Sequence, residues 1–163
     1  MYTGDYEVAH KHIEGQIRAV EKSMLLRIQG LRIDALHIQA RLALASAVGS
    51  QRERHLRLAE KLATNIEKEE MQYANPFATL IRAGIARQRG DQTSAIALLE
   101  KAAKDFDNVN MRLYAAAARR RLGEVRGGDR GRQLVAQSEE WMTKQEIKNP
   151  ARMMNLLAPG FTT

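Results

Sequence analysis

Arginine is the residue type in this chain whose placement could do chemistry. Residues 111–132 hold seven arginines against Glu124 and Asp129, and the whole chain of 163 residues carries a formal net charge of +7. Guanidinium groups bind carboxylates and phosphates through charge-assisted hydrogen bonds. The segment therefore predicts a surface for acidic partners. The alternative is a solvated helix face, because exposed arginines are common on helical proteins without any binding role.

The spacing of the arginines gives a second prediction. Three lie eight residues before a predicted turn glycine and would align as a ladder across neighbouring hairpins. Two further pairs are seven residues apart, which places each pair on one helix face. Where the first helices of hairpins line a groove, guanidinium groups would suit acidic peptides or terminal carboxylates. The predicted partner-binding residues are Arg41, Arg82, Arg89, Arg112, Arg119 and Arg120.

Other residue types lack a pattern that supports catalysis or metal binding. Cysteine is absent, which excludes disulfides, thiol nucleophiles and thiolate metal sites. His10 and His12 point to different faces of a helix, and neither His37 nor His55 has a partner at ligand spacing. The glycines of 123–131 follow a helix rather than a strand and lack the GK[ST] of a phosphate loop. We therefore expect no enzyme activity, no cofactor and no metal.

Composition predicts one folded domain. Apolar residues make up 44% of the chain, and its length suffices to bury a core. The longest apolar runs are only a few residues, which argues against a membrane span, and the start MYTGDYEVAH has no apolar h-region of a secretory signal. We expect a cytoplasmic protein without a membrane partner.

Helix signals are abundant and strand signals are nearly missing. Ala and Leu are frequent, and apolar residues recur at intervals of three and four. The stretch 20–48 predicts one long helix packed on more than one side. Cap signals predict the helix starts at Asp5, Ser50 with Glu53, Asn75-Pro76, Gly90-Asp91 and Asn149-Pro150.

One segment resembles a known repeat family. In GDQTSAIALLEKA at 90–102, the Gly-Asp turn, Ala95, Leu99 and Ala102 are similar to the second helix of a tetratricopeptide repeat (TPR), and GDYEVA at 4–9 has the same turn and small residue. The resemblance implies helical hairpins that bury their apolar stripes by stacking. Turn glycines at 4, 49, 90 and 128 recur at a period suited to such hairpins.

The predicted fold is all-α: antiparallel helical hairpins stacked as a short TPR-like superhelix of about eight helices. Because the chain opens at a turn glycine, we expect its first helix to be the second half of a repeat. Trp141 and the nearby methionines should form a hydrophobic seal, with the last helix covering the open end of the stack. A single domain, 1–163, would comprise a half repeat (1–22), a long hairpin (23–72), a TPR-like hairpin (75–106), a third hairpin (108–146) and a short capping helix (149–163).

A second resemblance covers most of the chain. The order GDY, LLRIQGLRIDALHIQARLALA, LIRAGIARQRGD, LYAAAARRRLGE and WMTKQEIKNPARMMNLLAPGF is similar to the C-terminal helical-repeat region of large multidomain bacterial serine/threonine protein kinases. This resemblance implies a non-catalytic regulatory or scaffolding segment. The kinase motifs themselves are absent from the sequence, so no catalytic residue can be assigned.

The expected function is protein–protein interaction: binding of a peptide, or of the kinase part of the same chain, in a basic groove. Binding of nucleic acid through 111–132 is an alternative. Aromatic residues are only 5% of the chain, however, which is few for base stacking. A structural spacer or a homodimer formed through the exposed first helix is a third hypothesis.

Overall fold

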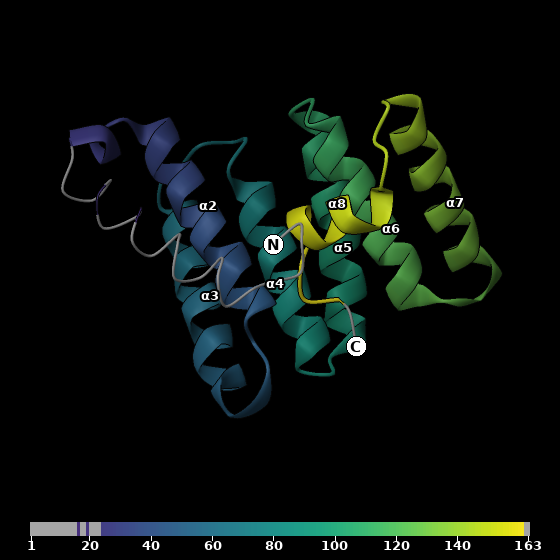
Figure 1. Cartoon of the computed structure of the whole chain (residues 1–163), viewed down its shortest axis with the longest axis horizontal. Coiled ribbons are helices and arrows are strands. Elements are labelled where there is room, and N and C mark those ends of the chain that lie inside the picture. The colour runs from purple at the N-terminus through teal and green to yellow at the C-terminus, as the bar shows by residue number, and fades with distance from the viewer. Residues whose placement is uncertain (1–15, 17–18, 20–23, 162–163) are drawn as a thin grey trace.

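The computed structural model describes residues 24–161 together with Gln16 and Ala19, and every regular element in this part is helical. The all-α prediction is thereby confirmed, and consecutive helices pack as neighbouring pairs (Figure 1). The helix predicted within 1–22 lies outside the described residues, apart from Gln16 and Ala19. The seven described α-helices are α2 (Gln29–Ala45), α3 (Arg52–Glu67), α4 (Asn75–Gln88), α5 (Gln92–Asn108), α6 (Arg112–Arg126), α7 (Gly128–Lys144) and α8 (Pro150–Leu157).

Helices α2 to α7 form three hairpins that stand side by side in chain order. Each helix packs on the next one, so α3 joins the first hairpin to the second and α5 joins the second to the third. The interior helices are therefore apolar on two sides: the run Ala115–Ala118 of α6 is buried throughout. We call the surface formed by the first helices of the hairpins, α2, α4 and α6, the first-helix face.

Two kinds of left-handed turn alternate along the chain. Turns inside hairpins use glycine, as predicted, with φ of 57°, 82° and 63° at Gly49, Gly90 and Gly128. Glycine adopts this conformation without a Cβ clash. The turns that follow the second helix of each hairpin use Glu70, Asn110 and Glu146 instead, and of these only asparagine is a residue type that favours positive φ.

The predicted long helix over 20–48 is shorter in the structure. A 3₁₀ turn, η1 (Met24–Arg27), comes first, and α2 begins only at Gln29 because Ile28 is extended, with φ −80° and ψ 113°. Apolar residues at helical spacing do not reveal such a break, since one extended residue changes the direction of the chain without changing its composition.

Of the five predicted caps, Asp5 lies outside the described residues, two form and two do not. The side chains of Asp91 and Asn149 accept backbone N–H bonds of 3.0 Å and 2.9 Å at the starts of α5 and α8. Ser50 instead belongs to a 3₁₀ turn, η2 (Gly49–Gln51), that leads directly into α3 without a side-chain cap. Asn75 is the first residue of α4 rather than its cap, so its side chain lies past the position from which it could cap.

The predicted position of the last helix is wrong. Instead of covering the end of the stack, α8 crosses the first-helix face, where its ribbon runs in front of α5 and α6 (Figure 1). Arg41 of α2 donates to Leu156 O at 2.9 Å, and Arg121 of α6 donates to Ala158 O at 2.9 Å. In this position Met154 and Leu157, on the apolar side of α8, are buried.

The predicted hydrophobic seal forms, although at a different place. Met142 and Met154 are fully buried in one cluster with Leu157 and the alanines of α6, and Trp141 and Met153 pack against it. Methionine suits this junction of three helices because its flexible side chain fills irregular gaps.

Candidate functional site

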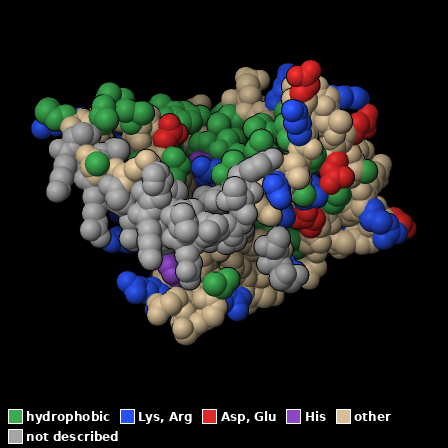
Figure 2. Space-filling model, in the orientation of Figure 1, with side chains coloured by type: hydrophobic (Ala, Val, Ile, Leu, Met, Phe, Trp, Pro, Cys, Tyr) green, Lys and Arg blue, Asp and Glu red, His purple; other side chains and the backbone are tan. Residues whose placement is uncertain are grey.

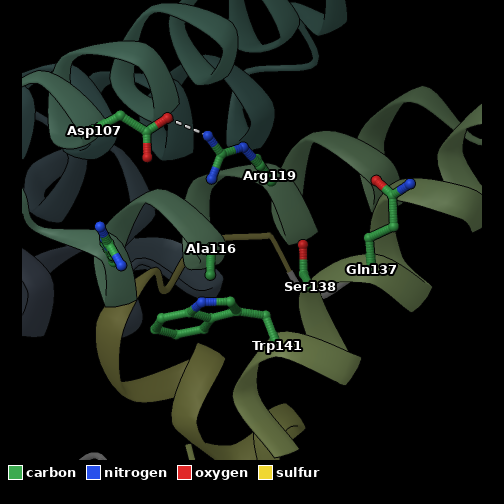
Figure 3. A pocket seen from close by; sticks show the side chains of 7 residues that line it. Asp107, Ala116, Arg119, Gln137, Ser138 and Trp141 are labelled. Atoms are coloured by element: carbon green, nitrogen blue, oxygen red, sulfur yellow. Dashed lines mark hydrogen bonds and ion pairs between the residues drawn. The ribbon is translucent and has the colours of Figure 1, made fainter. Parts of the chain in front are cut away.

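A pocket of about 340 Å³ opens where α6 and α7 meet the end of α5 (Figure 3). Helical spacing brings its lining together, because residues three, four and seven apart share one side of a helix. Helix α6 supplies one row of lining residues, α7 a second row, and α5 its last turn. The lining residues are Asp107, Arg112, Ala116, Arg119, Gln137, Ser138 and Trp141.

The two arginines of the pocket differ in their partners. Arg119 forms an ion pair with Asp107 across the α5–α6 contact, as the dashed line in Figure 3 marks. Arg112 is exposed and has no carboxylate partner among the described residues. Its guanidinium is therefore available to a ligand, whereas that of Arg119 is already paired with Asp107.

An aromatic ring lies beside this free guanidinium. The indole of Trp141 is half-buried between α6 and α7, and the exposed amide of Gln137 lies on the same wall. A flat apolar face next to a free cation suits a peptide that places a carboxylate beside an apolar side chain. The pocket thus brings together Arg112 and Arg119, two of the six arginines predicted from spacing.

Two other predicted arginines bind the neighbouring hairpin. Arg82 of α4 donates to Glu60 at 2.7 Å and to Glu67 at 2.9 Å, both on α3. These hydrogen bonds raise the pKa of Arg82, and the bond to Glu67 has the larger effect. Arg89 bonds to Glu53 of α3 at 2.8 Å. These arginines share a face, as their spacing predicts, and in this structure that face contacts α3.

The predicted ladder of three arginines does not form. Arg41 contacts the backbone of α8, Arg82 binds α3, and Arg120 binds Glu124 of its own helix and Glu139 of α7 at 2.8 Å. Equal offsets from turn glycines give equal positions along a helix. The carboxylate or carbonyl nearest to each arginine, however, comes from a different neighbouring helix. Whether any of these arginines also contacts a partner stays a prediction.

A contact between two glycines was missed by the sequence analysis. Gly123 of α6 and Gly131 of α7 bring the two helices into backbone contact, and a Cβ on Gly131 would lie 2.5 Å from Gly123 O. The available signal was their symmetry, since each lies four residues from the turn at Gly127. This close crossing sets the separation of the two helices that hold the pocket.

An aromatic cluster fills the junction of α2, α4, α5 and α6. His37 stacks on Phe77 with ring centroids 4.0 Å apart, and Tyr114 and Phe106 complete the cluster. His37 Nε2 is buried and has no hydrogen-bond partner among the described residues. Burial, helped by the charge of Arg41, holds the pKa of His37 well below its usual range.

This burial predicts a loss of stability in mild acid. The pKa of His37 is lower in the folded state than its unfolded value of 6.5. Its contribution to the free energy of unfolding is therefore complete above pH 6.5 and is lost as the pH falls below that value. Between pH 7 and about pH 5.5, one such histidine should lower the free energy of unfolding by about 1 kcal/mol. Urea titrations at both pH values measure this change.

The control is His37→Phe, which keeps an aromatic ring against Phe77 and removes the titrating group. In this variant the difference between the two pH values should shrink by the contribution of His37. An unchanged difference would assign the acid sensitivity to other groups.

No protein-family model, curated protein or solved structure matches this chain. Within the part of the chain that the structure describes, no group of three or more His, Asp or Glu side chains could hold a metal ion. In the same part, no helix has both the length and the apolar character needed to cross a bilayer.

Proposed function

We propose that this chain is a non-catalytic protein–protein interaction module whose α5–α6–α7 pocket binds an acidic peptide segment. The observation that carries the proposal is the free guanidinium of Arg112 beside the half-buried ring of Trp141. Aromatic and arginine side chains together are typical of the residues that dominate binding energy at protein interfaces.

The resemblance to kinase C-terminal regions supplies the proposed context. In this proposal, the stacked hairpins are a TPR-like repeat in the regulatory part of a bacterial serine/threonine kinase. The acidic segment then belongs to a separate protein or to the kinase part of the same chain. A partner held on the module would reach the kinase at a raised effective concentration.

The ion pairs around the pocket favour a peptide over a nucleic acid. Counterion-driven binding to phosphates needs several free cations along one surface. In 111–132 most arginines are already paired with carboxylates, which leaves only Arg112 and Arg130 without such a partner among the described residues. The paired arginines are Arg119 with Asp107, Arg120 and Arg121 with Glu124, Arg126 with Glu100, and Arg132 with Asp129.

Fluorescence of Trp141, the only tryptophan of the chain, tests the proposal directly. A synthetic peptide of Glu and Leu residues should change the emission on titration, and a Gln/Leu peptide of equal length should bind about tenfold more weakly, because it lacks the charge that pairs with Arg112. Arg112→Glu should weaken binding of the Glu/Leu peptide by at least this factor.

The matched control is Arg54→Glu, which reverses an exposed arginine of α3 and should leave the affinity unchanged. Equal binding of the two peptides, or no emission change with either, contradicts the proposal. A duplex DNA oligonucleotide that binds more tightly than the peptide, with an affinity that falls steeply as salt rises, would favour the nucleic-acid alternative.

Pairing with a second copy is a second candidate function, favoured by an exposed apolar stripe on the first hairpin. Met24, Ile28, Leu31 and Ile38 are 66%, 56%, 42% and 38% exposed, and hydrophobic side chains gather over this end of the molecule (Figure 2). Leu31 and Ile38 lie seven residues apart on α2 and so share one side of this helix, whereas Met24 and Ile28 precede it and extend the apolar surface that would form the seam of the pair.

Sedimentation at several concentrations tests this candidate. A reversible dimer should form, and Leu31→Glu should weaken it by at least about tenfold, because a charge at the centre of the seam would be buried. Leu58→Glu, which alters an exposed leucine of α3, is the control. A strict monomer at every concentration removes the candidate.

A further inference from the structure

The first-helix face holds a segment of the same chain in the manner of a bound peptide. Helix α8 packs on α6 and α7, and the four residues after it lie across α4 and α2, with their apolar side chains turned inward. The buried residues are Met154, Leu157, Ala158 and Phe161, each at most 7% exposed. The opposite side of α8, with Ala151 and Arg152, is exposed.

Two buried arginines of this face bind the carbonyl end of α8. Arg41 donates to Leu156 O and Arg121 to Ala158 O, both at 2.9 Å. Arg121 also donates to Asn155 Oδ1 at 3.0 Å, and its guanidinium lies 5.5 Å from the ring centre of Phe161. The last carbonyls of a helix lack partners within the helix and carry the negative end of its dipole, so cations there are favourable.

The backbone of the face leaves room for the extended residues that follow α8. A Cβ on Gly84 of α4 would lie 2.5 Å from Leu44 Cδ2 of α2 and 3.0 Å from Pro159 O, so a larger residue there would disturb both the α2–α4 contact and the path of the chain. Gly160 has φ of 92° and passes over Leu44 of α2 at a distance that excludes a Cβ. Glycines on both sides of the contact thus allow this close approach.

A short connection joins α8 to the rest of the molecule. Only residues 145–149 link it to α7, and α8 has eight residues. An isolated helix of this length is not stable in water. The segment is therefore ordered by the face on which it lies.

We propose that the first-helix face is a binding site for a short amphipathic helix whose C-terminal carbonyl groups bind the two arginines and whose following residues are extended. Residues 150–161 occupy this site in cis. A partner helix with the same apolar pattern binds by replacing them. This site adjoins the pocket of α5, α6 and α7 through Trp141, which packs against the cluster of Met142 and Met154, but the proposal does not depend on the function proposed for that pocket. Binding of the partner would require release of the resident segment, which competes at a high effective concentration because it is tethered.

The test uses the full chain with a protease site in place of residues 145–148, cleaved after folding. A fluorescent peptide of residues 149–163 is then added, and uptake is followed by anisotropy. We expect the cleaved protein to exchange its resident segment for the labelled one, and the uncleaved protein to bind at least about tenfold more weakly because of the tether.

Peptide variants distinguish specific uptake from nonspecific binding. Leu157→Asp in the peptide should reduce binding at least about tenfold, since this side chain is buried against the face. Ala151→Asp should leave binding unchanged, because Ala151 is exposed. Equal uptake of the two variants would contradict the proposal, as would a cleaved protein that keeps its circular dichroism but exchanges no peptide.

Hydrogen exchange on the uncut chain tests independently whether α8 opens without the rest of the fold. The amides of α8 should exchange through local opening, with protection at least about tenfold below that of α4 and α6. If the amides of α8 open only together with the whole molecule, or if the cleaved protein unfolds, the segment is part of the core and the proposal is wrong.

Discussion

Replacing Gly131 by alanine is expected to cost about 3 kcal/mol of folding free energy, at the upper end of the cost of overpacking. The added Cβ would lie 2.5 Å from the backbone carbonyl oxygen of Gly123, and no side-chain rotation relieves a clash with backbone. Helices α6 and α7 must then separate. Urea unfolding of the variant and of the natural sequence measures the loss.

Gly30→Ala provides the matched control for this prediction. Gly30 also lies within a helix, but a Cβ there would meet its nearest neighbour, the hydroxyl of Tyr73, at 3.8 Å. Alanine should therefore be neutral or should stabilise the protein by about 0.5–1 kcal/mol through its helix propensity. Equal stabilities of Gly131→Ala and the natural sequence would show that α6 and α7 do not cross this closely.

Separation of α6 and α7 should also change the shape of the pocket between them. Arg112 and Trp141 belong to these two helices, so widening their crossing moves the free guanidinium away from the ring. The Gly131→Ala protein should therefore bind the Glu/Leu peptide more weakly even at temperatures where it is fully folded. The two glycines would then act on binding by positioning the helices that bear the contact residues.

Arg121→Met is expected to cost about 3 kcal/mol and to loosen the C-terminal segment, because breaking a buried charged network leaves its partners unsatisfied. The side chain of Arg121 is 3% exposed and bonds to Ala158 O, Asn155 Oδ1 and Glu124. Methionine preserves much of the volume but none of these bonds. Urea unfolding gives the loss of stability, and the rate of tryptic cleavage after Arg152 reports release of α8.

The control for Arg121→Met is Arg132→Met. Arg132 is 75% exposed and forms an ion pair with the still more exposed Asp129, so its loss should change stability by less than about 0.5 kcal/mol. It should not accelerate cleavage after Arg152. If Arg121→Met unfolds at the same urea concentration as Arg132→Met, the contacts of Arg121 with the segment contribute little.

Several features that depend on neighbours in the chain were determined by the sequence alone, although the caps expected at Ser50 and Asn75 did not form. The helical class follows from apolar spacing, and the turns at Gly49, Gly90 and Gly128 follow from the freedom of glycine at positive φ. The caps at Asp91 and Asn149 follow from side chains that reach an amide three residues on. In each case the interacting groups lie within one turn of each other, so their geometry is fixed by local backbone sterics.

Features that depend on which helices become neighbours were decided only by the tertiary structure. Arg41 and Leu156 are 115 residues apart, and nothing near either one indicates that α8 lies across α2. The same holds for the choice of Arg121 over Arg120 as the contact of that segment, since the two arginines are adjacent and differ only in the side of α6 they occupy. Side-chain direction around a helix matters only once a partner surface is in place, and packing of distant segments supplies that surface.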